Sequence, residues 1–203
     1  VCFASDPSSG CSGSFALDNC EFDGTELTLN FSYTMDHYGI FCETGVGVQP
    51  PNIMHILNCK FANFNKAHIW ANDADGTSRF IIDGYKGFDT ISFSAANPRV
   101  YLRTERAIFV NGMYHRSVAS PSGLIWINPV SSGSGSQEIV IMGNSAWMAN
   151  GDSDFGVYIG NSVDRCTVIG NVGDCSISAR NLDNIIGIGD GDYNTNAMTV
   201  TLR

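Results

Sequence analysis

The sequence predicts an all-β protein, a right-handed parallel β-helix built as a single-stranded solenoid with irregular loops. Two short strand patterns alternate along nearly the whole 203-residue chain, and a turn containing Asn or Gly recurs between them. Helix signals are poor, because no window carries apolar residues at helical spacing over three turns. A β-sandwich or jelly roll is the alternative, but neither requires an Asn-Cys-x-Phe segment at equivalent positions, whereas stacked coils do.

The first pattern is an apolar stretch, a turn residue and further apolar residues. Its clearest copies are Leu17–Phe22 and Leu57–Phe61, and weaker copies follow at Ile82–Tyr85, Val110–Met113, Ile141–Asn144 and Val168–Asn171. Asn and Gly both tolerate the left-handed backbone conformation that bends a strand sharply, so each copy predicts a turn. On stacked coils we expect like residues to form ladders, hydrogen-bonded for Asn and packed for Cys and Phe.

The second pattern is a short strand with alternating side chains. Its copies are Gly39–Cys42, His68–Ala71, Thr90–Phe93, Leu124–Ile127, Gly156–Ile159 and Ser176–Ala179. Alternation places the aliphatic members in the interior, including Ile40, Ile69, Ile91, Ile125, Val157 and Ile177. The spacing between these anchors is irregular, which predicts loops of variable length on a fixed core.

No linker is long enough to divide the chain into two domains. We expect an N-terminal segment over residues 1–14, the β-helix over 15–190 and a C-terminal strand or cap over 191–203. The seven cysteines form no CxxC pair, so the sequence favours free thiols that act mostly as small core residues.

The chain is acidic, with a formal net charge of −9. Nucleic acids and anionic membranes bind clustered Lys and Arg, so neither is an expected partner, and no apolar run is long enough for membrane insertion. The four histidines lack metal-ligand spacing, and we expect no metal and no cofactor. Neutral glycans remain compatible with this charge.

An aromatic stripe is predicted on the outer face of the second strand pattern. Its members are Phe41, Trp70, Trp126 and Tyr158, with His68 expected on the same outward face beside Trp70. Soluble proteins seldom leave such a stripe uncovered. Three explanations stay open: a platform for sugar rings, a contact between subunits, and a loop of the same chain folded over it.

Acidic residues follow two of these strands. Glu43 follows the Ile40 strand, and Asp73 and Asp75 follow the Ile69 strand. Neighbouring coils would bring two carboxylates to the separation used in glycoside hydrolysis, so these three are the candidate catalytic residues. Alternatively, the aspartates are ordinary turn residues. A second group (Arg99, Arg103, Glu105 and Arg106) either holds an acidic sugar or forms a surface ion-pair network.

The Asn-Cys-x-Phe segments and the stretch Gly160–Asn171 resemble the pectate-lyase-like right-handed β-helix superfamily. Low Lys content and richness in Asn, Gly and Ser make the chain most similar to a phage tailspike or tail fibre. That resemblance implies a homotrimer on the virion tail that binds host surface polysaccharide and sometimes hydrolyses it. The alternatives are a purely structural β-helix or trimerisation segment of a fibre, and a secreted cellular polysaccharide lyase or glycoside hydrolase. Polygalacturonase and pectate-lyase catalytic signatures are absent from the sequence.

Overall fold

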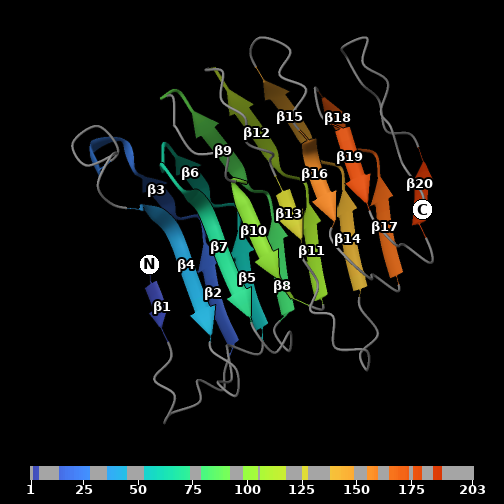
Figure 1. Ribbon diagram of the computed structural model, residues 1–203, viewed down its shortest axis with the longest axis horizontal. Helices are drawn as coiled ribbons and strands as arrows, with labels where there is room; N and C mark the ends of the chain where they lie inside the picture. The colour runs from blue at the N-terminus through green and yellow to red at the C-terminus, as the bar shows by residue number, and fades with distance from the viewer. Residues whose placement is uncertain are drawn as a thin grey trace.

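The protein is a right-handed parallel β-helix (Figure 1). The computed structural model describes residues 2–4, 14–27, 36–44, 53–73, 79–91, 98–104, 106–117, 125–127, 138–148, 155–159, 165–173, 176–179 and 185–188. The strands pair in parallel and form three sheets, here called A, B and C. The fold class predicted from the two strand patterns is therefore confirmed.

Each sheet takes every third strand of the chain. Sheet A contains β1 (Cys2–Ala4), β4 (Tyr38–Thr44), β7 (Ala67–Asp73), β10 (Val100–Arg103), β13 (Ile125–Ile127), β16 (Phe155–Ile159) and β19 (Ser176–Ala179). Sheet B contains β2 (Ser14–Asp18), β5 (Ile53–Leu57), β8 (Arg79–Asp83), β11 (Arg106–Val110), β14 (Glu138–Met142), β17 (Arg165–Ile169) and β20 (Ile185–Ile188). Sheet C contains β3 (Glu21–Asp23), β6 (Lys60–Ala62), β9 (Lys86–Asp89), β12 (Met113–Arg116), β15 (Ser145–Met148) and β18 (Val172–Gly173).

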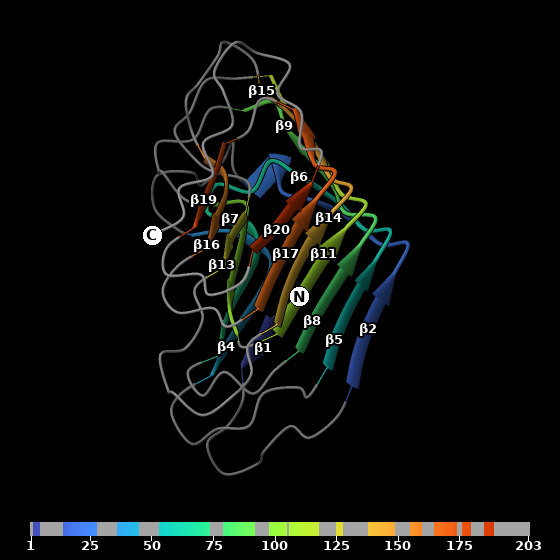
Figure 2. The ribbon, with the colours of Figure 1, turned by 90° about the vertical axis from the view of Figure 1, so that its right-hand side faces the viewer.

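The chain visits the sheets in the order A, B, C on successive coils, and Figure 2 shows the strands of each sheet stacked behind one another. β1 pairs with β4 from Cys2 onward, so sheet A begins inside the predicted N-terminal segment. The predicted C-terminal strand or cap over 191–203 lies outside the described residues.

The turn between sheets B and C recurs with the same backbone on six coils. Its first residue has a positive φ each time: Asn19, Asn58, Gly84, Asn111, Gly143 and Gly170. These are the six positions at which the sequence pattern predicted a turn. The amide of this residue donates to the last carbonyl of the next sheet B strand, as from Asn58 to Asp83 at 2.8 Å and from Gly84 to Val110 at 3.1 Å. This hydrogen bond therefore links each turn to the next coil.

Like residues do stack on neighbouring coils, as predicted. The Asn144 amide donates to the Asn171 side-chain oxygen at 2.8 Å, and both side chains are buried. The rings of Phe22 and Phe61 are stacked with centroids 4.9 Å apart. These contacts repeat along the solenoid axis and require the coils to stay in register.

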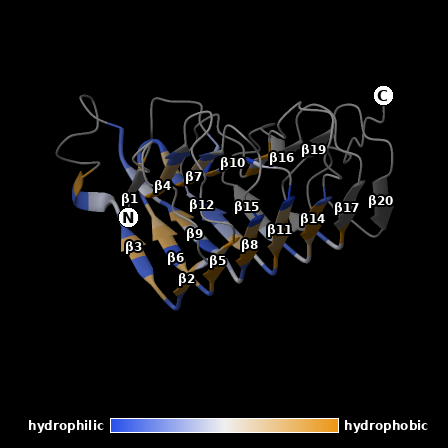
Figure 3. Ribbon diagram, turned by 90° about the horizontal axis from the view of Figure 1, so that it is seen from below, coloured by the Kyte–Doolittle hydropathy of each residue, from blue (hydrophilic) through white to orange (hydrophobic). Residues whose placement is uncertain are grey.

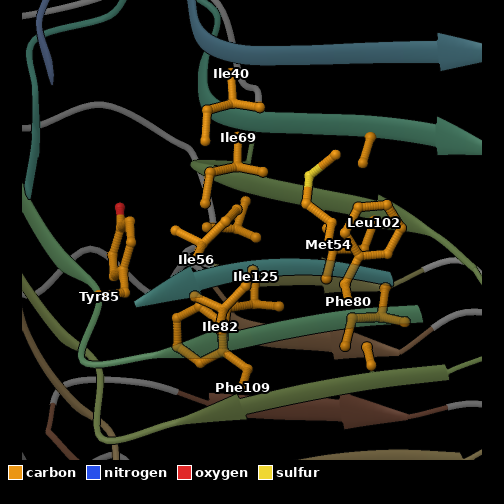
Figure 4. Packing of buried hydrophobic residues seen from close by; sticks show 14 of the residues in the cluster. Ile40, Met54, Ile56, Ile69, Phe80, Ile82, Tyr85, Leu102, Phe109 and Ile125 are labelled. Atoms are coloured by element: carbon orange, nitrogen blue, oxygen red, sulfur yellow. The ribbon is translucent and has the colours of Figure 1, made fainter. Parts of the chain in front are cut away.

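The interior is packed with aliphatic and aromatic side chains from all three sheets (Figure 4). Its fully buried members include Ile40, Ile69, Leu102, Ile125, Ile56, Ile82, Phe80, Phe109 and Tyr85. Cys42 and Cys59 are both buried in the core, which confirms for these two the prediction of small core residues.

One predicted strand was wrong. Thr90 and Ile91 follow β9 at the edge of sheet C instead of forming a strand of sheet A, and Ser92 and Phe93 lie outside the described residues. The sheet A strand of that coil is β10, which pairs with β7 and with β13. A short apolar run that ends one strand resembles a strand of its own, and periodicity alone does not separate the two.

Candidate functional site

Aromatic residues of sheet A occupy aligned positions in one row across consecutive coils. Strand register aligns Phe41 with Trp70, Trp70 with Tyr101, Tyr101 with Trp126, and Trp126 with Tyr158. We call these five residues the aromatic row. The sequence predicted four of these positions in one row, and strand register aligns them, but it had Ser92 where Tyr101 stands because the strand of that coil was misplaced. An apolar alternation in Val100-Tyr101-Leu102 was the signal that pointed to the correct strand.

At the start of the row, neighbouring aromatic rings pack against one another. The rings of Trp70 and Tyr101 lie 4.1 Å apart at an interplanar angle of 18°. Tyr38 packs against both Phe41 and Trp70, at centroid distances of 4.8 and 6.0 Å. Since the facing ring surfaces of Trp70 and Tyr101 cover each other, these surfaces are not available to a ligand.

Trp126 is arranged differently. Its ring lies 6.1 Å from that of Tyr101 at an interplanar angle of 77°, so the parallel stack ends here. The side chain is 38% exposed, while Phe41, Trp70 and Tyr101 are half-buried. Trp126 is therefore the aromatic surface that sheet A offers to solvent among the described side chains of the row. The backbone of Tyr158 is aligned with it on the next coil.

A row of polar side chains runs beside the aromatic row, two residues further along each strand. Glu43, Asn72 and Arg103 occupy these aligned positions on β4, β7 and β10. The Asn72 amide donates to the Glu43 carboxylate at 3.3 Å. We call these three residues the polar row. A carboxylate, an amide and a guanidinium next to aromatic rings can bind a ligand that has both hydroxyl groups and apolar faces.

The candidate catalytic carboxylates are only partly located. β4 and β7 are neighbouring strands, as the hypothesis required. Glu43, however, lies opposite Asn72, while Asp73 lies opposite Thr44 one position further on. The Asp73 side chain and the whole of Asp75 lie outside the described residues. Catalysis by this group stays a prediction.

His68 does not lie on the outer face, and this prediction was wrong. Its side chain is fully buried, with the rings of Phe61 and Phe64 at 5.9 and 6.1 Å. His68 lies at the start of β7, where the chain turns from sheet C into sheet A. Strand alternation does not extend across that corner, because the chain there is enclosed by both sheets.

A buried polar cluster surrounds His68. Its Nε2 lies 3.0 Å from Oδ1 of Asp89, and its Nδ1 contacts the hydroxyl of Tyr85. The Tyr114 hydroxyl donates to Oδ2 of Asp89 at 2.8 Å, and an Arg99 guanidinium nitrogen lies 3.6 Å from the same oxygen. These five residues are at most 1% exposed, and we call them the buried cluster.

Electrostatics in the buried cluster favour an ionised Asp89 beside a neutral His68. Burial alone raises the pKa of Asp89, but hydrogen bonds from His68 and Tyr114 and the positive charge of Arg99 outweigh it and lower the pKa to about 2. Burial lowers the pKa of His68, so its Nε2–H donates to Asp89 and its Nδ1 accepts from Tyr85. Burial likewise raises the pKa of both tyrosines.

Arg99 was predicted in a surface network or an acidic-sugar site, and that placement was wrong. Its side chain is fully buried and donates to the carbonyls of Phe64 at 2.7 Å and Lys66 at 3.2 Å. Arg99 therefore joins the corner between sheets C and A to Asp89. Arg103 is half-buried in the polar row, and Arg106 lies in sheet B.

Within the described ranges, no group of three or more His, Cys, Asp or Glu side chains is arranged to hold a metal ion. Those same ranges contain no helix with the length and apolar character needed to cross a bilayer. Comparison with protein-family models, curated proteins and solved structures finds no match.

Proposed function

We propose that the outer face of sheet A binds a polysaccharide, with Trp126 as the stacking surface. The observation that carries this proposal is the indole of Trp126, which is 38% exposed and perpendicular to the neighbouring Tyr101 ring. Sugar rings present apolar C–H faces that pack on aromatic rings, while their hydroxyl groups require hydrogen-bonding side chains. The polar row lies along the same strands and offers such groups.

An extended ligand fits this surface better than a single sugar. Both rows run along the solenoid axis, across the strands, and neighbouring coils are about 4.8 Å apart. From Trp70 to Trp126 the surface spans two such steps, or about 10 Å. A linear chain of sugars lying along the axis would contact several coils at once. The net charge of −9 favours a neutral polysaccharide, because an acidic one would be repelled.

The resemblance to phage tailspikes and tail fibres supports placing this activity on a virion, with host surface polysaccharide as the ligand. Hydrolysis of that ligand by Glu43 with Asp73 or Asp75 is part of the same hypothesis. A purely structural role in a fibre is the second candidate function. It is favoured by the stacked rings of Trp70 and Tyr101, which cover each other's ring faces and stabilise neighbouring coils without a ligand.

The test is to measure polysaccharide binding by calorimetry or on a glycan array, first with the unaltered protein. Trp126→Ala should weaken binding at least about tenfold, which corresponds to about 1.4 kcal/mol. Met113→Ala is the matched control, because Met113 is 42% exposed but lies on sheet C, and it should bind like the unaltered protein. Circular dichroism should show both variants folded.

Two results would count against polysaccharide binding. If no neutral or acidic polysaccharide binds the unaltered protein at millimolar concentration, the structural role is favoured. If a polysaccharide binds but Trp126→Ala and Met113→Ala bind it equally well, the site is not on the outer face of sheet A.

A further inference from the structure

The outer face of sheet B carries an aliphatic patch, interrupted by His55 on β5 and by Asp83 on β8. The outward residues at the middle of β8, β11 and β14 are aligned as Ile81, Ile108 and Val140. The outward residues at the ends of the strands add Leu57, Val110 and Met142. We call these six residues the aliphatic face. Met142 is 43% exposed and the other five are half-buried.

No described segment lies over the aliphatic face. In Figure 2 the strands of sheet B form an outer wall of the solenoid, and Figure 3 shows apolar colour along β8, β11 and β14 on that wall. A contiguous apolar patch on a soluble protein marks an interaction surface. The face contains aliphatic side chains without aromatic rings, so it fits another sheet better than a sugar.

Charged side chains border the aliphatic face unequally. β8 and β11 begin at Arg79 and Arg106, whereas β2 and β8 end at Asp18 and Asp83. All four project outward, because the residues between them alternate with the core. Positive charge therefore lies mainly at the start of the strands and negative charge at their end, with Glu138 at the start of β14 as the exception.

We propose that the aliphatic face is a homodimer interface, in which a second copy of the chain packs face to face about a two-fold axis parallel to the solenoid axis. That axis reverses the strand direction of the second copy and keeps the order of its coils. The start of each strand then lies over the end of its counterpart, so Arg79 meets Asp83 of the partner subunit. Ile81, at the middle of the strand, meets Ile81 of the partner subunit.

The aliphatic face is the centre of a larger surface, the whole outer wall of sheet B, whose size suits this arrangement. The seven strands lie about 4.8 Å apart and are four or five residues long at about 3.3 Å each, so the wall covers roughly 500 Å² per copy. Two copies would bury about 1,000 Å², which reaches the lower limit for a specific interface. The charges of β8 match themselves about this axis, as a two-fold interface requires, while Arg106 and Glu138 lie opposite Val110 and Met142 of the partner subunit.

This inference does not depend on polysaccharide binding, because sheets A and B are different walls of the solenoid. It also differs from the homotrimer that the tailspike resemblance implies. A three-fold axis would bring sheet B against a different surface of the neighbouring copy, and Arg79 would not meet Asp83 of the partner subunit.

Sedimentation equilibrium tests the proposal. The unaltered chain should be a dimer at about 100 μM, well above a micromolar dissociation constant. Met142→Glu should raise the dissociation constant at least tenfold, because it places a charge in the aliphatic face. Met113→Glu is the control, since Met113 is equally exposed but lies on sheet C, and it should leave the dissociation constant unchanged.

A charge exchange tests the pairing itself. Arg79→Glu places like charges opposite each other in its own homodimer, and so does Asp83→Arg, so each should be largely monomeric. In an equal mixture of the two variants, a mixed dimer brings the two substituted side chains, of opposite charge, together. It also brings the unaltered Arg79 of one chain against the unaltered Asp83 of the other, so the dimer should return. Recovery on mixing cannot arise from misfolded variants.

Three results would overturn the proposal. The first is an unaltered chain that stays monomeric at about 100 μM, and the second is an unaltered chain that forms a trimer. The third is a mixture of the folded Arg79→Glu and Asp83→Arg variants that remains monomeric, because it contradicts the antiparallel arrangement.

Discussion

Replacing Asp89 with Asn should destabilise the coils around the corner between sheets C and A. The carboxylate accepts hydrogen bonds from Tyr114, His68 and the backbone amide of Asn63, and it lies 3.6 Å from Arg99. The Asn side chain has nearly the same volume, so packing changes little. The substitution removes the one negative charge of the buried cluster, which lies 3.6 Å from the Arg99 guanidinium.

The expected loss in free energy of unfolding is about 3–5 kcal/mol, the usual cost of removing one partner of a buried ion pair. Asp89 and Arg99 are 1% and 0% exposed, so water does not screen the remaining charge. Glu21→Gln provides the contrast, because Glu21 pairs with Lys60 on the surface and is 62% exposed. Loss of that pair should change the free energy by less than about 1 kcal/mol.

The assay is chemical unfolding followed by circular dichroism, combined with amide hydrogen exchange. Coils in a solenoid contact only their neighbours, so Asp89→Asn should lower exchange protection most in β6, β9 and β12. Adding Arg99→Met to Asp89→Asn removes the buried positive charge and should recover part of the lost stability.

The reasoning would be refuted if Asp89→Asn cost no more than Glu21→Gln. A second comparison uses the loss in free energy of unfolding that Arg99→Met causes in the unaltered protein. The reasoning would also be refuted if adding Arg99→Met to Asp89→Asn caused the same further loss. Either result would mean that Asp89 does not compensate the buried charge of Arg99.

Two further predictions concern pH and the turn residues. The pKa of Asp89 is lowered from 3.8 to about 2, and that of His68 is lowered from 6.5. Both groups therefore stabilise the fold fully above their unfolded pKa. The midpoint of thermal unfolding should fall as the pH drops from about 6.5 toward 2, and Asp89 should contribute about 2 kcal/mol of the loss in stability. An unchanged midpoint between pH 7 and 3 would contradict this prediction. Gly170 has a φ of 65°, and a Cβ added at this residue would have nothing within 4 Å. Thermal unfolding should therefore show Gly170→Asn to be nearly neutral and Gly170→Val to be destabilised by about 1–2 kcal/mol. Equal melting temperatures of the two variants would count against a strained turn.

Local sequence determined the parts of the fold that a single coil can specify. The turn residues, such as Asn58 and Gly170, were recognisable because only Asn and Gly readily adopt a positive φ. Alternation identified the interior of most sheet A strands, and it placed Trp70 and Trp126 in the same outer row. Both signals are short-range, so they survive loops of any length between the strands.

Sequence spacing could not show which apolar run on each coil belongs to which sheet. Tyr101 was missed for this reason, since the run beginning at Thr90 looked equally strand-like. The orientation of Trp126, perpendicular to Tyr101 where Trp70 is parallel, depends on side-chain packing between coils that no single strand encodes. It is this difference in orientation that narrows the candidate glycan surface to one indole.

The sequence by itself determined that the chain winds into stacked coils, because each turn and each alternating strand carries its own conformational preference. Only the tertiary structure decided that His68 and Arg99 are interior residues gathered around Asp89. At the corner between sheets C and A the alternation of side chains no longer separates inside from outside. Burial there depends on residues brought in from neighbouring coils, such as Tyr85 and Tyr114, which lie far from His68 along the chain but next to it in space.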